Sequence, residues 1–127
     1  MRVMLIEDDA LVRRMISEAL DVEGMEVDGL ASAEDALVLL GAGQVPDVLV
    51  ADVNLGSGLS GSDLATIARE RHPGVEVVLI SGQPIDDAGT RAPMQRRERF
   101  LRKPFPPEAL TEAIRQAAAD AAAPSPG

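Results

Sequence analysis

The chain has 127 residues, of which 46% are hydrophobic, so it can form one globular domain with a substantial core but is too short for two. Its formal net charge of −9 argues against direct DNA binding, and the lack of cysteine excludes disulfides, thiolate metal sites and cysteine nucleophiles. No segment approaches the ~20 apolar residues of a membrane span, and the start does not resemble a signal peptide, so we expect a cytoplasmic protein without membrane contact.

Short apolar runs alternate along the chain with segments whose apolar residues recur at helical spacing. The runs predict buried strands and the periodic segments predict helices. Ser32, with Asp35 three residues later, resembles a helix-capping box, and Pro73-Gly74 breaks another helix. In chain order we predict a strand at 3–6, a helix at 11–20, a strand at 26–30, a helix from the Ser32 cap to Gly41, a strand at 48–51, a helix at 63–71, strands at 75–80 and 99–102, and a helix from 106 to about 122.

This alternation predicts an α/β fold in which helices cover both faces of a parallel sheet. Ligands of doubly wound sheets bind beyond the carboxyl ends of the strands. Polar residues stand at those ends here: Glu7 and Asp8 after the first strand, Asp52 after the third, Ser81 after the fourth and Lys103 after the last. We therefore expect these side chains to meet at one edge of the sheet.

The chemistry of these side chains points to phosphoryl transfer. Carboxylates from two strands make an oxygen-rich site suited to Mg²⁺. An aspartate can attack phosphorus to form an aspartyl phosphate, whose oxygens a lysine and a hydroxyl could bind. Each residue alone has an ordinary explanation as a cap, turn or surface residue. Their occurrence together at successive strand ends favours a functional site, and Lys103 is the only lysine in the chain.

Four segments, LIEDDALVRR, VLVADVNL, VVLISG and FLRKPF, resemble the receiver domain of two-component response regulators over about residues 2–119. The resemblance implies a flavodoxin-like, five-stranded parallel sheet in the order 2-1-3-4-5, with residues 1–120 as the domain. It also implies that Asp52 accepts a phosphoryl group, with Mg²⁺, from a histidine kinase or histidine phosphotransfer protein. Phosphorylation would then switch a partner-binding surface.

By the same resemblance, the acidic residues and Asn54 bind the metal. Asp8 matches a direct ligand, Glu7 a ligand that acts through water, and Asn54 the position whose backbone carbonyl binds the metal beside Asp52. Asp9 is not part of this set, and we interpret it as a charge that favours the start of the first helix.

The remaining matches concern the response to phosphorylation. Ser81 matches the switch hydroxyl and Lys103 the lysine that pairs with the phosphate, through a bond to Pro104 that is cis in the family. Phe100 stands at the family's aromatic switch position, although ordinary core packing explains it equally well.

Several features depart from the family's pattern. Segment 83–98, where the family has its fourth helix, lacks a clear apolar stripe, so that helix is expected to be short, displaced or disordered. The loop NLGSGLSG is richer in glycine than the family's proline-containing loop. No output domain follows, which favours a stand-alone regulator, with a fragment of a hybrid kinase as the alternative. Residues 121–127 form an Ala/Pro-rich tail that we expect to be flexible.

The basic cluster at 91–103 could be a solvated face or a docking patch. With no output domain in view, we predict a protein partner on the face formed by the fourth helix, the last strand and the last helix. A phosphorylation-dependent homodimer is a further possibility.

Other functions fit parts of the pattern. A haloacid-dehalogenase-type, Mg²⁺-dependent phosphatase would need a second acid two residues after Asp52, where Asn54 stands. A degenerate receiver that only binds partners is disfavoured, because every phosphorylation residue is present. Gly56–Gly61 spells G-x-G-x-x-G but lacks the acidic residue about 20 positions on that a dinucleotide site needs. The single histidine, His72, is expected to be exposed and inert.

Overall fold

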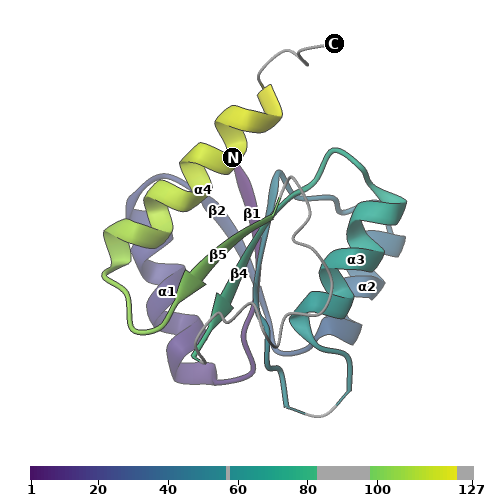
Figure 1. The fold of residues 1–127 in the computed structure, drawn as a ribbon, viewed down its shortest axis with the longest axis horizontal. Helices are drawn as coiled ribbons and strands as arrows, with labels where there is room; N and C mark the ends of the chain where they lie inside the picture. Colours follow the sequence, from purple (N-terminus) through teal and green to yellow (C-terminus); the bar gives the residue numbers. More distant parts are fainter. Residues whose placement is uncertain (57, 83–97, 123–127) are drawn as a thin grey trace, which may run out of the picture.

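A five-stranded parallel sheet forms the centre of the computed structural model, which describes residues 1–56, 58–82 and 98–122 (Figure 1). The strand order is β2-β1-β3-β4-β5, which confirms the predicted order. All neighbouring strands run parallel. The strands are β1 (Arg2–Ile6), β2 (Glu26–Leu30), β3 (Val48–Asp52), β4 (Glu76–Ser81) and β5 (Glu98–Arg102).

Helices cover both faces of the sheet, as predicted. In the described part of the chain they are α1 (Ala10–Val22), α2 (Ala33–Gly41), α3 (Gly61–Arg71) and α4 (Pro107–Ala122). Figure 1 shows α1 and α4 on one side and α2 and α3 on the other. The expectations for the family's fourth helix and for the end of the tail concern residues 83–97 and 123–127, which lie outside the described residues.

Side chains on the two faces of the sheet pack into two separate hydrophobic cores. Met4 and Ile6 belong to the core beneath α2 and α3, whereas Val3 and Leu5 belong to the core beneath α1 and α4. Strands β3 and β4 are buried along their whole length, which explains their continuous apolar runs. Strand β2 lies at the edge and is half-exposed, so its sequence is more polar.

Side-chain caps fix where the helices begin. The Asp9 carboxylate accepts the N–H groups of Leu11 and Val12 at 2.9 and 3.1 Å, which confirms Asp9 as a charge at the start of α1. Helix α3 begins two residues earlier than the predicted position 63. The reason is a reciprocal capping box between Ser60 and Asp63, which the sequence interpretation did not use.

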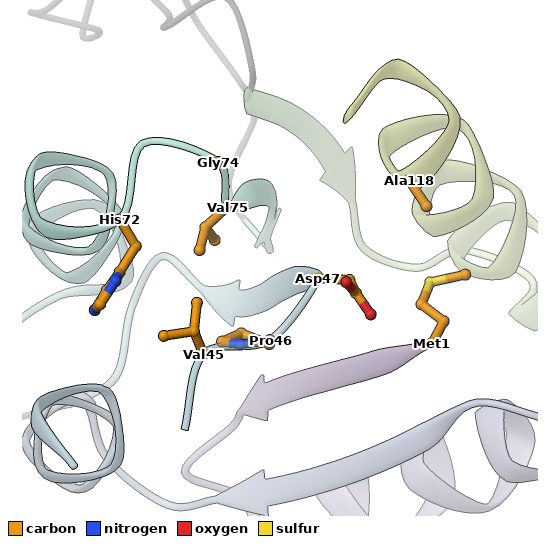
Figure 2. Close-up of a pocket in the computed structure, with 8 residues that line it drawn as sticks. All are labelled: Met1, Val45, Pro46, Asp47, His72, Gly74, Val75 and Ala118. Atoms are coloured by element: carbon orange, nitrogen blue, oxygen red, sulfur yellow. The ribbon is translucent and has the colours of Figure 1, made fainter. Parts of the chain in front are cut away.

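A surface hollow of about 580 Å³ lies at the amino ends of the strands (Figure 2). Asp47 and His72 line it. His72, the C-cap of α3, is half-buried rather than exposed as predicted. None of the predicted site residues lines this hollow. None of the helices that the structure describes is long and apolar enough to cross a bilayer.

Candidate functional site

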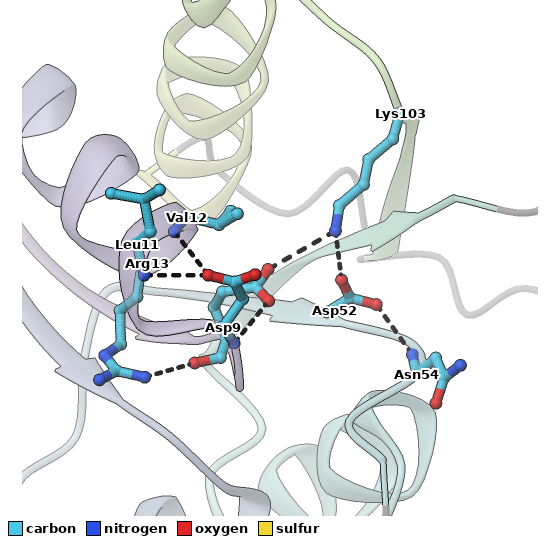
Figure 3. Close-up of polar contacts among 8 residues, drawn as sticks. Asp9, Leu11, Val12, Arg13, Asp52, Asn54 and Lys103 are labelled. Atoms are coloured by element: carbon cyan, nitrogen blue, oxygen red, sulfur yellow. Dashed lines mark hydrogen bonds and ion pairs between the residues drawn. The ribbon is translucent and has the colours of Figure 1, made fainter.

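The predicted site residues do converge at the carboxyl edge of the sheet. Asp52 is the last residue of β3 and Ser81 the last of β4, while Glu7 and Lys103 directly follow β1 and β5. Ile80 of β4 pairs with Asp52 on one side and with Leu101 of β5 on the other. Lys103 therefore lies two residues beyond the level of Asp52, and its long side chain reaches back to the carboxylate. Figure 3 shows the side chains of Asp52 and Lys103 pointing toward each other.

Lys103 lies between two buried carboxylates. Its Nζ is 2.6 Å from Asp52 Oδ2 and 3.6 Å from Glu7 Oε1 (Figure 3). Asp52 is 6% exposed and Glu7 2% exposed, so both carboxylates have lost most of their contact with water. Buried charges need partners of opposite sign, and the Lys103 ammonium is such a partner for both.

The electrostatics of the cluster show that one cation does not fully compensate it. Burial raises the pKa of Glu7, and the neighbouring Asp8 and Asp52 raise it further, against the lowering effects of the Asp9 backbone N–H and of Lys103. Burial alone would lower the pKa of Lys103, but the hydrogen bond and charge of Asp52 outweigh burial and raise it. The charged form of the lysine is therefore favoured, whereas burial and the neighbouring acids disfavour the Glu7 anion, which a further cation would stabilise.

Glu7 is held by backbone contacts on one side only. Its Oε2 accepts the Asp9 N–H at 3.1 Å, whereas its buried Oε1 has no hydrogen bond in the described part of the chain. The Arg13 guanidinium donates to the Glu7 carbonyl oxygen at 2.7 Å, which fixes the backbone of the acidic pair (Figure 3). Arg13 was not among the predicted site residues. The sequence feature that could have pointed to it is its position one helical turn after the Asp9 cap.

The loop after β3 is tied to Asp52 by short-range contacts. The Asn54 N–H donates to Asp52 Oδ1 at 2.9 Å, and the Gly56 N–H donates to Asn54 Oδ1 at 3.2 Å. Gly61, at the start of α3, packs directly on the Asp52 backbone, because a Cβ there would lie 2.2 Å from the Asp52 carbonyl oxygen. Gly61 is a second residue that sequence interpretation missed, since this contact depends on where α3 docks.

Asp8 is exposed and points toward the same loop, since a Cβ at Gly56 would lie 3.6 Å from Asp8 Oδ2. Within the described ranges, no group of three acidic or histidine side chains gathers closely enough to hold a metal ion by itself. A bound Mg²⁺ would thus need backbone carbonyl and water ligands as well. The donors present are all oxygens, and the buried Glu7 Oε1 without a hydrogen bond suits a metal-bound water, so the residues fit Mg²⁺.

Of the two predicted switch residues, Ser81 stands at the same edge of the sheet as Asp52. Ser81 is 9% exposed, and its carbonyl oxygen accepts the Lys103 N–H at 2.8 Å. Phe100 is half-buried and packs against the core beneath α2 and α3, so core packing accounts for at least part of its role. The Lys103-Pro104 peptide bond is cis, as expected.

Comparisons with known proteins agree with this geometry. Residues 3–115 match the model of the family described as the response regulator receiver domain. The chain is 33% identical over 113 residues to the response regulator protein FleR of Pseudomonas aeruginosa, covering 89% of this chain and 24% of FleR. It spans only about a quarter of FleR and of the transport regulator DctD of the same organism.

Solved structures show the same architecture. A response regulator receiver protein from Sinorhizobium medicae superposes with a TM-score of 0.84 at 26% identity, over 94% of this chain and 95% of that one. The receiver domain of the hybrid histidine kinase CckA superposes with a TM-score of 0.77 at 28% identity, over 93% of this chain and 99% of that one.

Proposed function

Since this chain belongs to the response regulator receiver domain family, we propose that Asp52 is its phospho-acceptor and that a histidine kinase or histidine phosphotransfer protein is the donor. Receiver domains act in two-component signalling, and the alternatives of a phosphatase or a degenerate binding module are not favoured. The observation that carries the proposal is the Lys103 ammonium 2.6 Å from a buried aspartate at a strand end. A lysine there balances the carboxylate before transfer and can bind phosphoryl oxygens afterwards.

The transfer is a displacement at phosphorus. An Asp52 carboxylate oxygen forms the new P–O bond as the P–N bond to the donor's imidazole breaks, and the imidazole leaves with the electron pair and takes up a proton. The Asn54 N–H holds Oδ1 of Asp52, which orients Oδ2 toward Lys103 and the incoming phosphoryl group. Lys103 then neutralises charge on the phosphoryl oxygens. The chain supports its own modification and does not turn over an external substrate.

Receiver domains generally bind Mg²⁺, and four residues of this chain would hold it. Asp8 and Asp52 offer carboxylate oxygens, Asn54 a backbone carbonyl, and Glu7 an oxygen that would act through water. When bound, Mg²⁺ supplies positive charge that shields the attacking carboxylate from the phosphoryl oxygens. Without such a cation, three acids and a phosphate dianion would repel one another at this edge.

The output surface includes β5 and α4. Because the Lys103 N–H bonds to the Ser81 carbonyl, a lysine that follows the phosphoryl group pulls on the end of β5, which also carries Phe100. Strand β5 is joined to α4 by an ion pair between Arg99 and Asp120. We therefore place the downstream protein partner, or a phosphorylation-dependent second copy, on this face; the family's fourth helix, which was also predicted to contribute, falls in residues 83–97, outside the described residues. The net charge of −9 favours a protein over DNA.

The donor needs a different surface, close enough for its histidine to reach Asp52. A groove of about 310 Å³ runs between α1 and the connection from β5 to α4, and Lys103 forms part of its wall. Leu11 and Met15 on α1 are 67% and 60% exposed, so the apolar surface continues outward from the groove. We place the phosphodonor there, and we propose a cytoplasmic location shared with the kinase. Phosphotransfer to wild type and to Asp52→Asn, with and without Mg²⁺, tests the proposed function.

A further inference from the structure

The loop between β3 and α3 must hold its shape although it is rich in glycine. Gly56 and Gly58 both have positive φ, at 79° and 86°, in the left-handed region that favours glycine. The loop carries Asn54, whose backbone carbonyl is the proposed metal ligand nearest Asp52. A flexible loop would place that carbonyl poorly, so whatever restrains the loop also bears on the metal site.

Glu34 restrains the loop from outside. This residue lies in the first turn of α2, and its Oε2 accepts the Leu59 N–H at 3.1 Å. The other hydrogen bonds of the described loop residues join them to Asp52, Asn54, Val53 or the Asp63 cap, and the Val53 N–H donates to the Ile80 carbonyl of β4. Among the described residues, Glu34 therefore gives the hydrogen bond that ties this loop to α2.

The backbone at Gly58 comes unusually close to this carboxylate. A Cβ at Gly58 would lie 2.7 Å from Glu34 Oε2 and 3.3 Å from its Cδ. Glycine at this position therefore lets the loop approach Glu34 closely enough for the next residue, Leu59, to donate its N–H to the carboxylate. The close approach and the hydrogen bond are two observations of one contact, which we call the Glu34 latch.

We propose that Glu34 is a positioning residue that fixes the β3–α3 loop, and with it the Asn54 carbonyl, for Mg²⁺ binding next to Asp52. This inference rests on the proposed function of Asp52. The latch replaces, from α2, the stiffness that a proline would give to a loop of this length. It acts on the metal and not on the phosphoryl group, because Glu34 does not contact Asp52 or Lys103 in the described structure.

A helix-dipole explanation makes a different prediction. Glu34 and Asp35 are both acidic residues in the first turn of α2, and either would favour the positive end of that helix. The described residues show no hydrogen bond from the loop to the Asp35 side chain. Asp35→Ala is therefore a matched control that removes the same charge from the same turn while keeping the latch.

The experiment compares wild type, Glu34→Ala, Glu34→Gln and Asp35→Ala. Amide hydrogen exchange reports on the Leu59 N–H in metal-free protein, and calorimetric titration with MgCl₂ measures the affinity. We expect Glu34→Ala to lose Leu59 protection and to bind Mg²⁺ about fivefold more weakly, the scale of one lost hydrogen bond. Glu34→Gln keeps an acceptor oxygen, so it should keep both the protection of the Leu59 N–H and the Mg²⁺ affinity. Asp35→Ala should match wild type in both measurements.

A third readout separates positioning from a general loss of structure. The rate of labelling by acetyl phosphate should fall for Glu34→Ala at low Mg²⁺ and return to the wild-type rate at saturating Mg²⁺. Unchanged Mg²⁺ affinity in Glu34→Ala, or an equal loss in Asp35→Ala, overturns the latch while leaving the proposed function standing. A wild-type chain that binds no Mg²⁺ and takes no label overturns both.

Discussion

Lys103 Nζ rests 2.6 Å from Asp52 Oδ2, so the ammonium at the end of β5 reaches past β4 to the carboxylate at the end of β3. The same ammonium is 3.6 Å from Glu7 Oε1. In the unphosphorylated state this one cation serves two buried acids. A phosphoryl group or a cation that enters the site changes the ion pairs of Lys103 with Asp52 and Glu7. The expected effects of several substitutions follow from this change.

Asp52→Asn should abolish labelling by acetyl phosphate or by a donor kinase, because an amide is not a nucleophile toward phosphorus. Wild type should be labelled only with a divalent metal. The measurement is intact-mass or radiolabel incorporation with Mg²⁺ or with a chelator. Label that persists in Asp52→Asn would move the acceptor to another residue.

Lys103→Ala should still accept some phosphoryl group but should not pass the signal on, since the cation that follows the phosphoryl oxygens is gone. The readout is partner binding or dimerisation at matched levels of phosphorylation. Arg102→Ala is the control, because Arg102 is the neighbouring exposed cation on β5. A Lys103→Ala protein that responds fully would show that a different group reads the phosphate.

Glu7→Gln should stabilise the metal-free protein at neutral pH by about 1 kcal/mol, the scale for relieving strain at a functional site. A carboxyl whose pKa is raised on folding destabilises the folded state above that pKa. The difference from wild type should therefore shrink as the pH falls toward the ordinary value of 4.5. Melting curves from pH 7 to 4.5 measure this effect.

Added Mg²⁺ should raise the wild-type melting temperature progressively, because it binds the folded cluster and not the unfolded chain. Glu7→Gln should weaken this response. If wild type ignores Mg²⁺ and Glu7→Gln is the less stable protein, the acids are structural and not a metal site.

Met15→Glu should impair phosphotransfer from a donor protein while leaving labelling by acetyl phosphate intact. The substitution places a charge on the exposed apolar surface beside the groove but does not touch Asp52. Val38→Glu on α2 is a matched control, since Val38 is 70% exposed on the opposite face of the sheet. If Met15→Glu lost labelling by acetyl phosphate as much as phosphotransfer from the donor protein, Met15 would act on the phosphorylation site itself.

Gly61→Ala should destabilise the fold by about 2 kcal/mol or more, because its Cβ would meet the Asp52 carbonyl oxygen at 2.2 Å and push α3 away from β3. Gly41→Ala is the control: nothing lies within 4 Å of a Cβ there, so it should be neutral or slightly stabilising. Chemical denaturation of both variants measures the contrast.

The sheet could be predicted largely because the inner strands β1, β3 and β4 contain apolar runs that stop at polar residues. Asp52 and Ser81 were located by those stops, and parallel pairing then brings them to one edge without further information. Arg13 and Gly61 could not be found this way. Their contacts depend on how α1 and α3 dock on the sheet. No local sequence pattern specifies that the Arg13 guanidinium will bond to the Glu7 carbonyl, or that the Gly61 backbone will pack against that of Asp52.

The division of the core by the sheet has an evolutionary consequence. Neighbouring residues such as Leu49 and Val50 pack into different cores, so a change of side-chain volume on one side is compensated by residues on that side. The side that carries the proposed donor groove can therefore diverge to suit a new kinase while the side beneath α2 and α3 stays unchanged. Two related pathways in one cell would then become separate through substitutions on the side of the sheet that carries α1 and α4.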